Sequence, residues 1–500
     1  MSNSFNIKQR RLKKVFSSCF FFILFLFTNT VFAQETAQIK MLTLQQVVAM
    51  AKEQSPAAKQ ASTQLENKYW SYRTYKSNYK PQLGLNGTLP DFNRSIITVT
   101  QDDGTEAFKR RSLSTSSLDL SLSQNVGFTG GEVFVSSQLQ RIDIFTAPGG
   151  TSYLANPAII GFRQPLFMFN YLTWDKKIEP LKYEESKRQY LEDMEAVGQR
   201  ASELFFNLLL AQINLEIAQK NLLNNDTLYR ISAGRFNLGK IAENDLLQME
   251  LSVMNARNNI SQGALDVQLG TLRLKNFLTL TGDEKIVLIE PGMIPGFDVD
   301  INKALAEAKK NRQQVISFER LKLEAEREVA RAKGENRLNA DLIASYGLTQ
   351  SAPLVENAYL NPLEQERLRV GFQIPIVDWG RAKSQIRTAK ANQELVELNI
   401  TQAEQNFEQE ILLLVTQFKM YREKLVISIK SDTIAQRRYD ITVQRYMIGK
   451  IGILDLNVAL DEKIQAKRAY VQSLWDFWNA YFELRRKTLF DFEQQKEISY

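Results

Sequence analysis

Two long stretches without proline constrain the fold of this chain more than any other feature of its sequence. No proline occurs between Pro180 and Pro291, and none follows Pro375 in the 500-residue sequence. Because proline breaks helix interiors, windows of this length are typical of long helices. Beyond residue 380 the only glycines are Gly449 and Gly452, which stand close together. This part of the chain therefore predicts a long helix, a tight turn and another long helix.

Apolar residues recur at alternating steps of three and four in both windows, which predicts helices over Trp174–Phe236 and Arg381–Tyr446. The first seam comprises Met194, Val197, Ala201, Leu204, Leu208, Ala211, Leu215, Ala218 and Leu222, and the second Phe407, Ile411, Leu414, Phe418, Tyr421 and Leu425. At 1.5 Å per residue each helix would be roughly 90 Å long. Further apolar residues beside the first seam predict more than one packing neighbour. An exported coiled coil is the alternative at this point.

The N-terminus has the pattern of a secretory signal peptide over residues 1–33. A basic patch at Lys8–Lys14 precedes the apolar run Val15–Phe27, and small or neutral residues lead to a predicted cleavage after Ala33. Cys19 is disfavoured as a lipid acceptor because the apolar run continues beyond it. The segment holds five positive and no negative charges, so the formal charge of +7 falls to +2 for residues 34–500. Nucleic-acid binding thereby loses its electrostatic basis.

The residue types exclude much of enzyme chemistry. The sequence has no His and one Cys, which removes His general bases, Ser-His-Asp triads, disulfides and zinc sites built from these residues. Residues Gly234–Ile241 nearly match a phosphate-binding loop, but Ile241 stands where Ser or Thr should bind Mg²⁺, and a helix rather than a strand precedes them. We expect no enzyme activity, no cofactor and no metal.

The chain contains an internal duplication. Residues Arg235–Ile241 read RFNLGKI and residues Arg445–Ile451 read RYMIGKI, at an offset of 210, and an Asp-Leu pair follows each four positions later. Residues 44–52 resemble residues 301–309 at an offset of 257. Such self-similarity indicates a repeated structural unit. The difference between the offsets gives the first copy 47 extra residues before its long helix.

Those extra residues lie in a segment rich in Ser, Thr and Gly with alternating apolar residues, which predicts strands. Strands are expected in the first copy at Gln82–Leu89, Leu118–Gln124, Val133–Leu139 and Ala158–Gln164, and in the second at Asn339–Tyr346 and Leu368–Ile374. The expected fold is mainly α with a few membrane β-strands, built from a duplicated helix-helix-strand-strand-helix-helix unit. A few strands per chain cannot close a barrel, which needs about eight, so several chains must pool them.

The expected organisation follows from this duplication. Residues 34–280 form the first repeat, with an inserted hairpin near residues 91–157. Residues 281–299 form a linker and residues 300–500 the second repeat.

The signal peptide, the duplicated unit and the paired turns resemble the TolC outer-membrane efflux family over almost the whole mature chain. The resemblance implies a homotrimer in the outer membrane of a Gram-negative bacterium, in which a shared β-barrel continues as an α-helical barrel into the periplasm. It implies a passive exit duct of a tripartite efflux or type I secretion system, with a periplasmic adaptor, an inner-membrane pump and outer-membrane lipid as partners. The alternative is a periplasmic coiled-coil adaptor or structural protein, which fits two hairpins with strands between them less well.

The resemblance also assigns roles to the turns. Adaptor docking would use the tip residues Arg235, Leu238, Gly239, Ile241, Arg445, Ile448, Gly449 and Ile451. Asp245 and Asp455 would face a narrowed periplasmic entrance, with Tyr446 helping to tie it shut. The chain departs from the family's best-studied members at Ile451, where they carry a basic residue, and at Val458, where they carry a second acidic one. The resemblance leaves open the cargo, the pump, the latch, and whether the hairpin near residues 118–144 belongs to the barrel or forms an outer flap.

Overall fold

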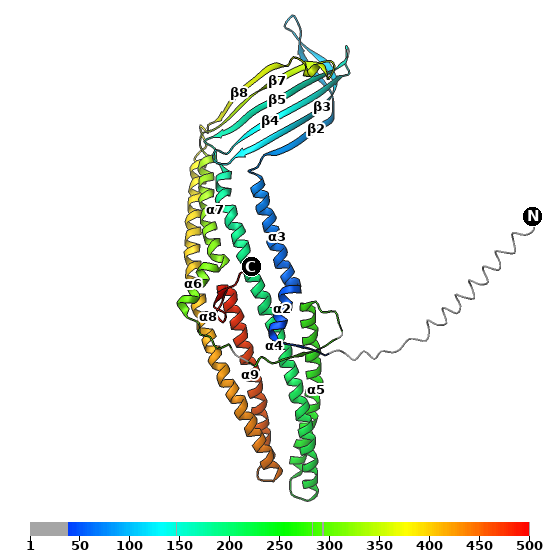
Figure 1. Ribbon diagram of the computed structural model, residues 1–500, viewed down its shortest axis with the longest axis vertical. Helices are drawn as coiled ribbons and strands as arrows, with labels where there is room; N and C mark the ends of the chain where they lie inside the picture. Colours follow the sequence, from blue (N-terminus) through cyan, green and yellow to red (C-terminus); the bar gives the residue numbers. More distant parts are fainter. Residues whose placement is uncertain (1–38, 147, 283, 293–294, 500) are drawn as a thin grey trace, which may run out of the picture.

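The computed structural model describes residues 39–146, 148–282, 284–292 and 295–499, so the predicted signal peptide lies outside the described residues. The molecule is elongated, with a curved sheet at one end and long helices running away from it (Figure 1). None of the helices in these ranges combines the length and apolar character needed to cross a membrane.

The helices confirm the internal duplication. Helices α4 and α8 each have 67 residues, and α5 and α9 each have 36. The first copy contains α2 (Leu44–Gln54), α3 (Pro56–Ser77), β2 (Gln82–Thr100), β3 (Glu106–Val126), β4 (Gly131–Ile144), β5 (Gly150–Leu166), α4 (Tyr171–Asn237) and α5 (Glu243–Leu278). The second contains α6 (Ile301–Asn311), α7 (Gln313–Glu335), β7 (Asn339–Ala352), β8 (Leu363–Gln373), α8 (Arg381–Met447) and α9 (Ile453–Thr488). The long helices therefore begin and end at matching positions in both copies, at the offset of 210 residues found in the sequence.

Short elements complete the fold at the middle and at the C-terminus. They are β1 (Ile39–Leu42), β6 (Lys285–Leu288), the 3₁₀ turn η1 (Asn357–Tyr359), β9 (Phe490–Asp491) and β10 (Lys496–Glu497). Strand β6, in the interval between the two copies, pairs in parallel with β1. The start of the described chain is thereby fastened beside the middle of the molecule.

The large sheet has the strand order β2-β3-β4-β5-β7-β8, and every neighbouring pair in it is antiparallel. The predicted inserted hairpin is present, with Leu118 opposite Leu139. The strands run longer than the sequence pattern predicts. In β2 and β5 the pattern stops at Pro90 and Pro157, but both prolines lie at register shifts of the ladder. A register shift tolerates the missing proline N–H, and pairing resumes beyond it.

The core lies at the waist of the molecule, where α4, α8 and α9 meet the short helices. Seam residues of both long helices are buried there, including Leu204, Leu208, Ile411 and Phe418. Helix α9 adds four aromatic side chains to this core, Phe477, Trp478, Tyr481 and Phe482, which are all buried. Because α4 contacts α5, α7 and α9 as well as α3, its broad apolar surface is explained by several neighbours.

A buried ion network joins the two copies at this waist. Glu195 of α4 is almost fully buried, and its Oε1 accepts a hydrogen bond from Lys52 Nζ of α2 at 2.5 Å. Its Oε2 accepts from Arg485 Nε of α9 at 3.0 Å, and Arg485 also pairs with Asp491 of β9. Burial raises the pKa of the Glu195 carboxyl, but Lys52 and Arg485 outweigh burial and hold that pKa below its usual value.

We expect Glu195→Gln to lower the stability of the protein by up to about 3 kcal/mol, because it leaves the half-buried Lys52 without its counter-charge and Arg485 with Asp491 alone. The midpoint of thermal unfolding of the purified protein measures this. Because the pKa of Glu195 is lowered, the stability that its carboxylate contributes is present above the unfolded-state pKa of Glu and is lost as pH falls through the folded-state pKa. The variant should therefore lose part of the acid sensitivity of the wild type.

The matched control for this prediction is Glu216→Gln, which removes the exposed i,i+4 pair of Glu216 with Lys220 on the same helix. Surface pairs of this kind contribute at most about 1 kcal/mol. Equal destabilisation by the two variants would contradict the role given to Glu195.

Candidate functional site

The turns that end the two long helices have the same backbone geometry. Gly239 and Gly449 have φ of +66° and +75°, the left-handed region that favours glycine. In the first turn the N–H of Lys240 donates to the Arg235 carbonyl at 2.9 Å, and in the second the N–H of Lys450 donates to the Arg445 carbonyl at 3.0 Å. These bonds close each helix as in a Schellman-type end, which explains why the RxxxGK pattern occurs twice.

Arg235 joins the two turns of the chain. Its Nη2 donates to the carbonyl of Met447 at 2.9 Å and to that of Tyr446 at 3.3 Å. Its guanidinium also lies 5.4 Å from the centre of the Tyr446 ring, within the range of a cation–π contact. The equivalent Arg445 is exposed, and its guanidinium has no hydrogen-bond partner among the described residues. The two repeat-related arginines therefore have different environments.

Tyr446 is buried at the same junction. Its hydroxyl lies 3.0 Å from the Ser232 hydroxyl of α4, and this contact is itself buried. The ring belongs to a small core separate from the waist, formed by Leu228, Met249, Tyr439, Tyr446, Ile453, Leu456 and Ala459. The structure thus places Tyr446 in contact with both hairpins, while its predicted part in closing an entrance stays a prediction.

The extreme tips are apolar and open. Leu238 and Ile448 are 71% and 67% exposed, while Ile241 and Ile451 are half-buried and Ile451 packs against the small core. A Cβ atom on Gly239 would meet nothing within 4 Å, and one on Gly449 only the Arg235 side chain at 3.8 Å. The turns therefore offer small, uncovered surfaces beside exposed apolar side chains.

The two aspartates lie in the first turns of the returning helices, Asp245 in α5 and Asp455 in α9. Neither has a salt-bridge partner among the described residues. Asp455 is exposed and lines a groove of about 680 Å³ between α8 and α9. The groove is formed by Ile434, Arg437, Arg438, Ile441, Thr442, Arg445, Ile451, Asp455 and Val458. The structure thus brings Arg445, Ile451 and Asp455 together and keeps Asp245 on the other hairpin.

Sequence reasoning missed two features of this end. Ser232, the partner of Tyr446, is a small polar residue inside a helix and carries no pattern of its own. Arg437 and Arg438 line the same groove as Asp455, and Arg438 pairs there with Glu462. Their counterparts 210 positions earlier are Thr227 and Leu228, so the duplication could not point to them.

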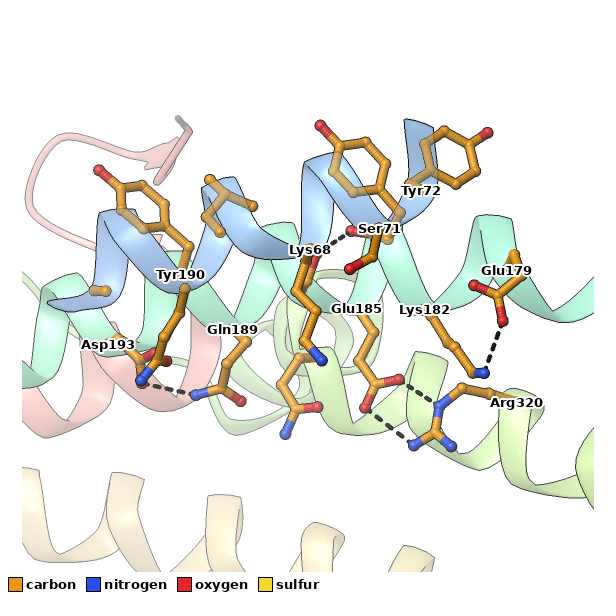
Figure 2. A pocket seen from close by; sticks show the side chains of 16 residues that line it. Lys68, Ser71, Tyr72, Glu179, Lys182, Glu185, Gln189, Tyr190, Asp193 and Arg320 are labelled. Atoms are coloured by element: carbon orange, nitrogen blue, oxygen red, sulfur yellow. Dashed lines mark hydrogen bonds and ion pairs between the residues drawn. The ribbon is translucent and has the colours of Figure 1, made fainter. Parts of the chain in front are cut away.

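A second cavity, of about 510 Å³, lies between α3, α4 and α7 (Figure 2). Its charged side chains are largely paired: Arg320 holds Glu185 at 2.6 and 3.2 Å, and Lys182 donates to Glu179 at 2.8 Å. Within the described ranges no group of three or more His, Cys, Asp or Glu residues is placed to hold a metal ion. The Arg320–Glu185 pair joins α7 to α4, whereas Lys182 and Glu179 pair within α4.

Comparison with known proteins identifies a family and a set of similar structures. The outer membrane efflux protein family matches residues 47–279 and 304–486, which is most of the chain. No curated protein sequence gives a significant match.

Three solved structures illustrate the likeness of fold. The CmeC outer membrane channel of Campylobacter jejuni superposes with a TM-score of 0.65 at 15% identity, over 91% of this chain and 87% of CmeC. The outer membrane protein VceC of Vibrio cholerae gives 0.61 at 13% identity, over 91% and 97%. The MtrE outer membrane channel of Neisseria gonorrhoeae, in its open state, gives 0.60 at 14% identity, over 91% of both chains.

The family match covers both copies of the duplicated unit, including the two turns and the long helices that carry them. The chain therefore belongs to the outer membrane efflux protein family, whose members are passive outer-membrane channels that extend into the periplasm and are not enzymes.

Proposed function

We propose that this protein is the exit duct of a tripartite efflux or type I secretion system, a homotrimer docked by a periplasmic adaptor and an inner-membrane pump. The observation that carries the proposal is the pair of open sheet edges. Within the described chain β2 pairs only with β3 and β8 only with β7. Open edges with free backbone groups favour pairing with further strands. Since β2 and β8 run in opposite directions, β8 of one copy can pair antiparallel with β2 of the next.

The outer face of the sheet supports contact with lipid. Residues of alternating strand positions form an exposed apolar band, for example Leu83 on β2, Ile160 on β5 and Leu368 on β8. Alternation of apolar and polar positions is typical of strands with lipid on one side and water on the other. Trp379, between β8 and α8, is 96% exposed, which suits an aromatic residue at a membrane interface.

Exposed apolar seams on the long helices support the association of several chains. Large apolar residues at heptad-like spacing are uncovered on α5 and α8, although the same helices bury other faces. On α5 they are Leu247, Leu251, Met254, Leu265, Leu269 and Leu272, and on α8 Leu395, Leu398, Leu412, Ile427, Ile434 and Ile441. Apolar seams of this kind are typical of helices that pack against another chain.

The docking proposal predicts that Gly239→Trp or Gly449→Trp blocks export while trimers still form, because the indole fills the open space at the tip. The matched controls are Gly239→Ala and Gly449→Ala. They carry the same penalty of about 1–2 kcal/mol for a left-handed non-glycine residue without the bulk. Export of a pump substrate and the amount of heat-sensitive trimer on gels provide the measurements. Normal export in both Trp variants, or equal loss in the Ala variants, would reject docking at the tips.

The contact between the turns predicts a gating role for Arg235. Arg235→Ala removes two hydrogen bonds from a charged donor, each contributing about 1.5–3 kcal/mol. We expect a larger conductance in lipid bilayers, because the hairpins can then separate. Tyr446→Phe and Ser232→Ala break the same hydroxyl contact. Each single variant should therefore raise the conductance as much as the double variant does. Arg230→Ala is the control, since Arg230 pairs only locally with Asp226, and an equal rise in conductance there would contradict the assignment.

The entrance proposal predicts that the double variant Asp245→Asn, Asp455→Asn lowers the preference of the pore for cations over anions. In a trimer the two positions supply six carboxylates, and a ring of carboxylates attracts cations. Because Arg437 and Arg438 line the groove of Asp455, their replacement by Gln should raise the cation preference instead. Reversal potentials in a salt gradient measure both effects.

The alternative for the aspartates is stabilisation of the helix starts. Glu243→Gln tests it, because Glu243 shares the first turn of α5 but lies two positions away, on the opposite side of the helix. If the aspartates only stabilise the helices, all three replacements should lower thermal stability and leave ion selectivity unchanged.

A further inference from the structure

The two copies contribute unequally to the sheet. The second copy supplies β7 and β8, whereas the first supplies β2 and β5 with β3 and β4 inserted between them. We propose that each β3–β4 hairpin is a fixed part of the channel wall, so that the trimer crosses the outer membrane through an 18-stranded wall. Three copies of six strands give this number. The inference rests on the proposed trimer and adds that the inserted hairpins make the exit wider than a wall of 12 strands would be.

The pairing of the inserted strands supports a place in the wall. Strand β3 follows β2 from the pair Gln82–Ser123 to the pair Thr100–Glu106. Strand β4 follows β5 from Glu132–Arg163 to Ile144–Gly150, with one register shift. An outer flap would have to give up both ladders, which would leave two long rows of backbone groups unpaired.

The side-chain pattern of the insertion is that of the rest of the sheet. On β3 and β4 the residues Leu118, Leu120, Leu122, Val133 and Val135 are all exposed on one face. Their register makes them part of the same band: Leu122 lies opposite Leu83 of β2 and Val135, and Val135 lies opposite Ile160 of β5. Asp119, Ser121 and Ser136, at the alternate positions, belong to the other face. A flap surrounded by water would need no apolar row in register with its neighbours.

The lower turn of the insertion is fastened to the junction between sheet and helices. Asn170, the N-cap residue of α4, donates from Nδ2 to the carbonyl of Gly127 at 3.0 Å, and Gln164 Nε2 donates to that of Thr129 at 3.0 Å. On the other side Asn125 Nδ2 donates to the carbonyl of Asn78 at 3.0 Å. The turn has no helix of its own, yet it is held between the end of α3 and the start of α4. This anchoring supports a rigid wall element.

The inserted strands change the proportions of the channel. Beneath the six strands, the helices that contact one another in sequence are α3, α4, α7 and α8 (Figure 1). Barrel diameter grows roughly in proportion to the number of strands, and barrels of about 16–18 strands enclose a water-filled bore. With the hairpin in the wall, the outer-membrane segment is about one and a half times as wide as it would be without it. Without it, four strands would stand above four helices.

Cysteine pairs test whether the hairpin lies in the wall of the assembled trimer. Cys19 is the chain's only cysteine and lies in the predicted signal peptide, so no native cysteine of the mature chain competes with the introduced pairs. The pair Asn86→Cys with Asp119→Cys reports β2–β3, and Glu132→Cys with Arg163→Cys reports β4–β5. Arg163→Cys with Ile343→Cys reports β5–β7 and is the matched control, because it should form in either arrangement.

We expect all three disulfides in trimers isolated from the outer membrane. Formation of the control alone would place the hairpin outside the wall and overturn the inference, while the trimer and the proposed function would stand. Absence of any outer-membrane trimer would overturn the proposed function itself, and the 18-stranded wall with it.

The width of the exit is tested with neutral polymers added to the outer side of single channels in bilayers. Deletion of residues 106–147 removes the hairpin and joins β2 to β5, which leaves 12 strands in a trimer. Because diameter follows strand number, the largest polymer that enters should fall to about two thirds of its diameter for the full chain. An unchanged size limit in folded, trimeric deletion protein would overturn the inference.

Discussion

The carboxylate of Glu195 is the point on which the relative placement of the two copies depends. It lies in the middle of α4, is almost fully buried, and receives a cation from α2 on one side and from α9 on the other. Arg485 extends the network to Asp491, so strand β9 is fastened at the same place. A buried charge with directional partners fixes one arrangement, whereas apolar helix faces alone can slide along one another. From this waist the sheet extends in one direction and the two hairpins in the other.

Beyond the waist the two copies are matched in backbone and different in chemistry. The same turn geometry occurs at Gly239 and Gly449, but Arg235 reaches across to the other turn and Arg445 does not. The residue equivalent to Tyr446 is Phe236, which has no hydroxyl to bond a serine. Within one chain, the first turn therefore reaches the second through Arg235, and no equivalent side chain of the second turn reaches the first.

Much of this architecture could be predicted from the sequence because it depends on backbone rules. Absence of proline and heptad spacing predict the long helices, and a paired glycine motif predicts their turns. The strand ends could not be predicted, because a proline usually ends a strand and the pattern therefore stops at Pro90 and Pro157. The register shifts that accommodate these prolines are visible only in the pairing of the folded strands. The contacts of Ser232 and Arg437 were equally hidden, because they depend on which faces of separate helices meet. Such tertiary contacts leave no periodic trace in the sequence.

The unequal sheet also bears on where selection of cargo can occur. The long helices have equal lengths in the two copies, so the duct keeps its repeat symmetry from the waist to the tips. The 47 extra residues all enter at the sheet, where they add strands without adding helices. Extra strands widen a wall, whereas the contacts of Arg235 and Tyr446 draw the hairpins together at the opposite end. The contacts that hold the two hairpins together thus lie at the end of the molecule that also carries Asp245, Asp455 and Arg445.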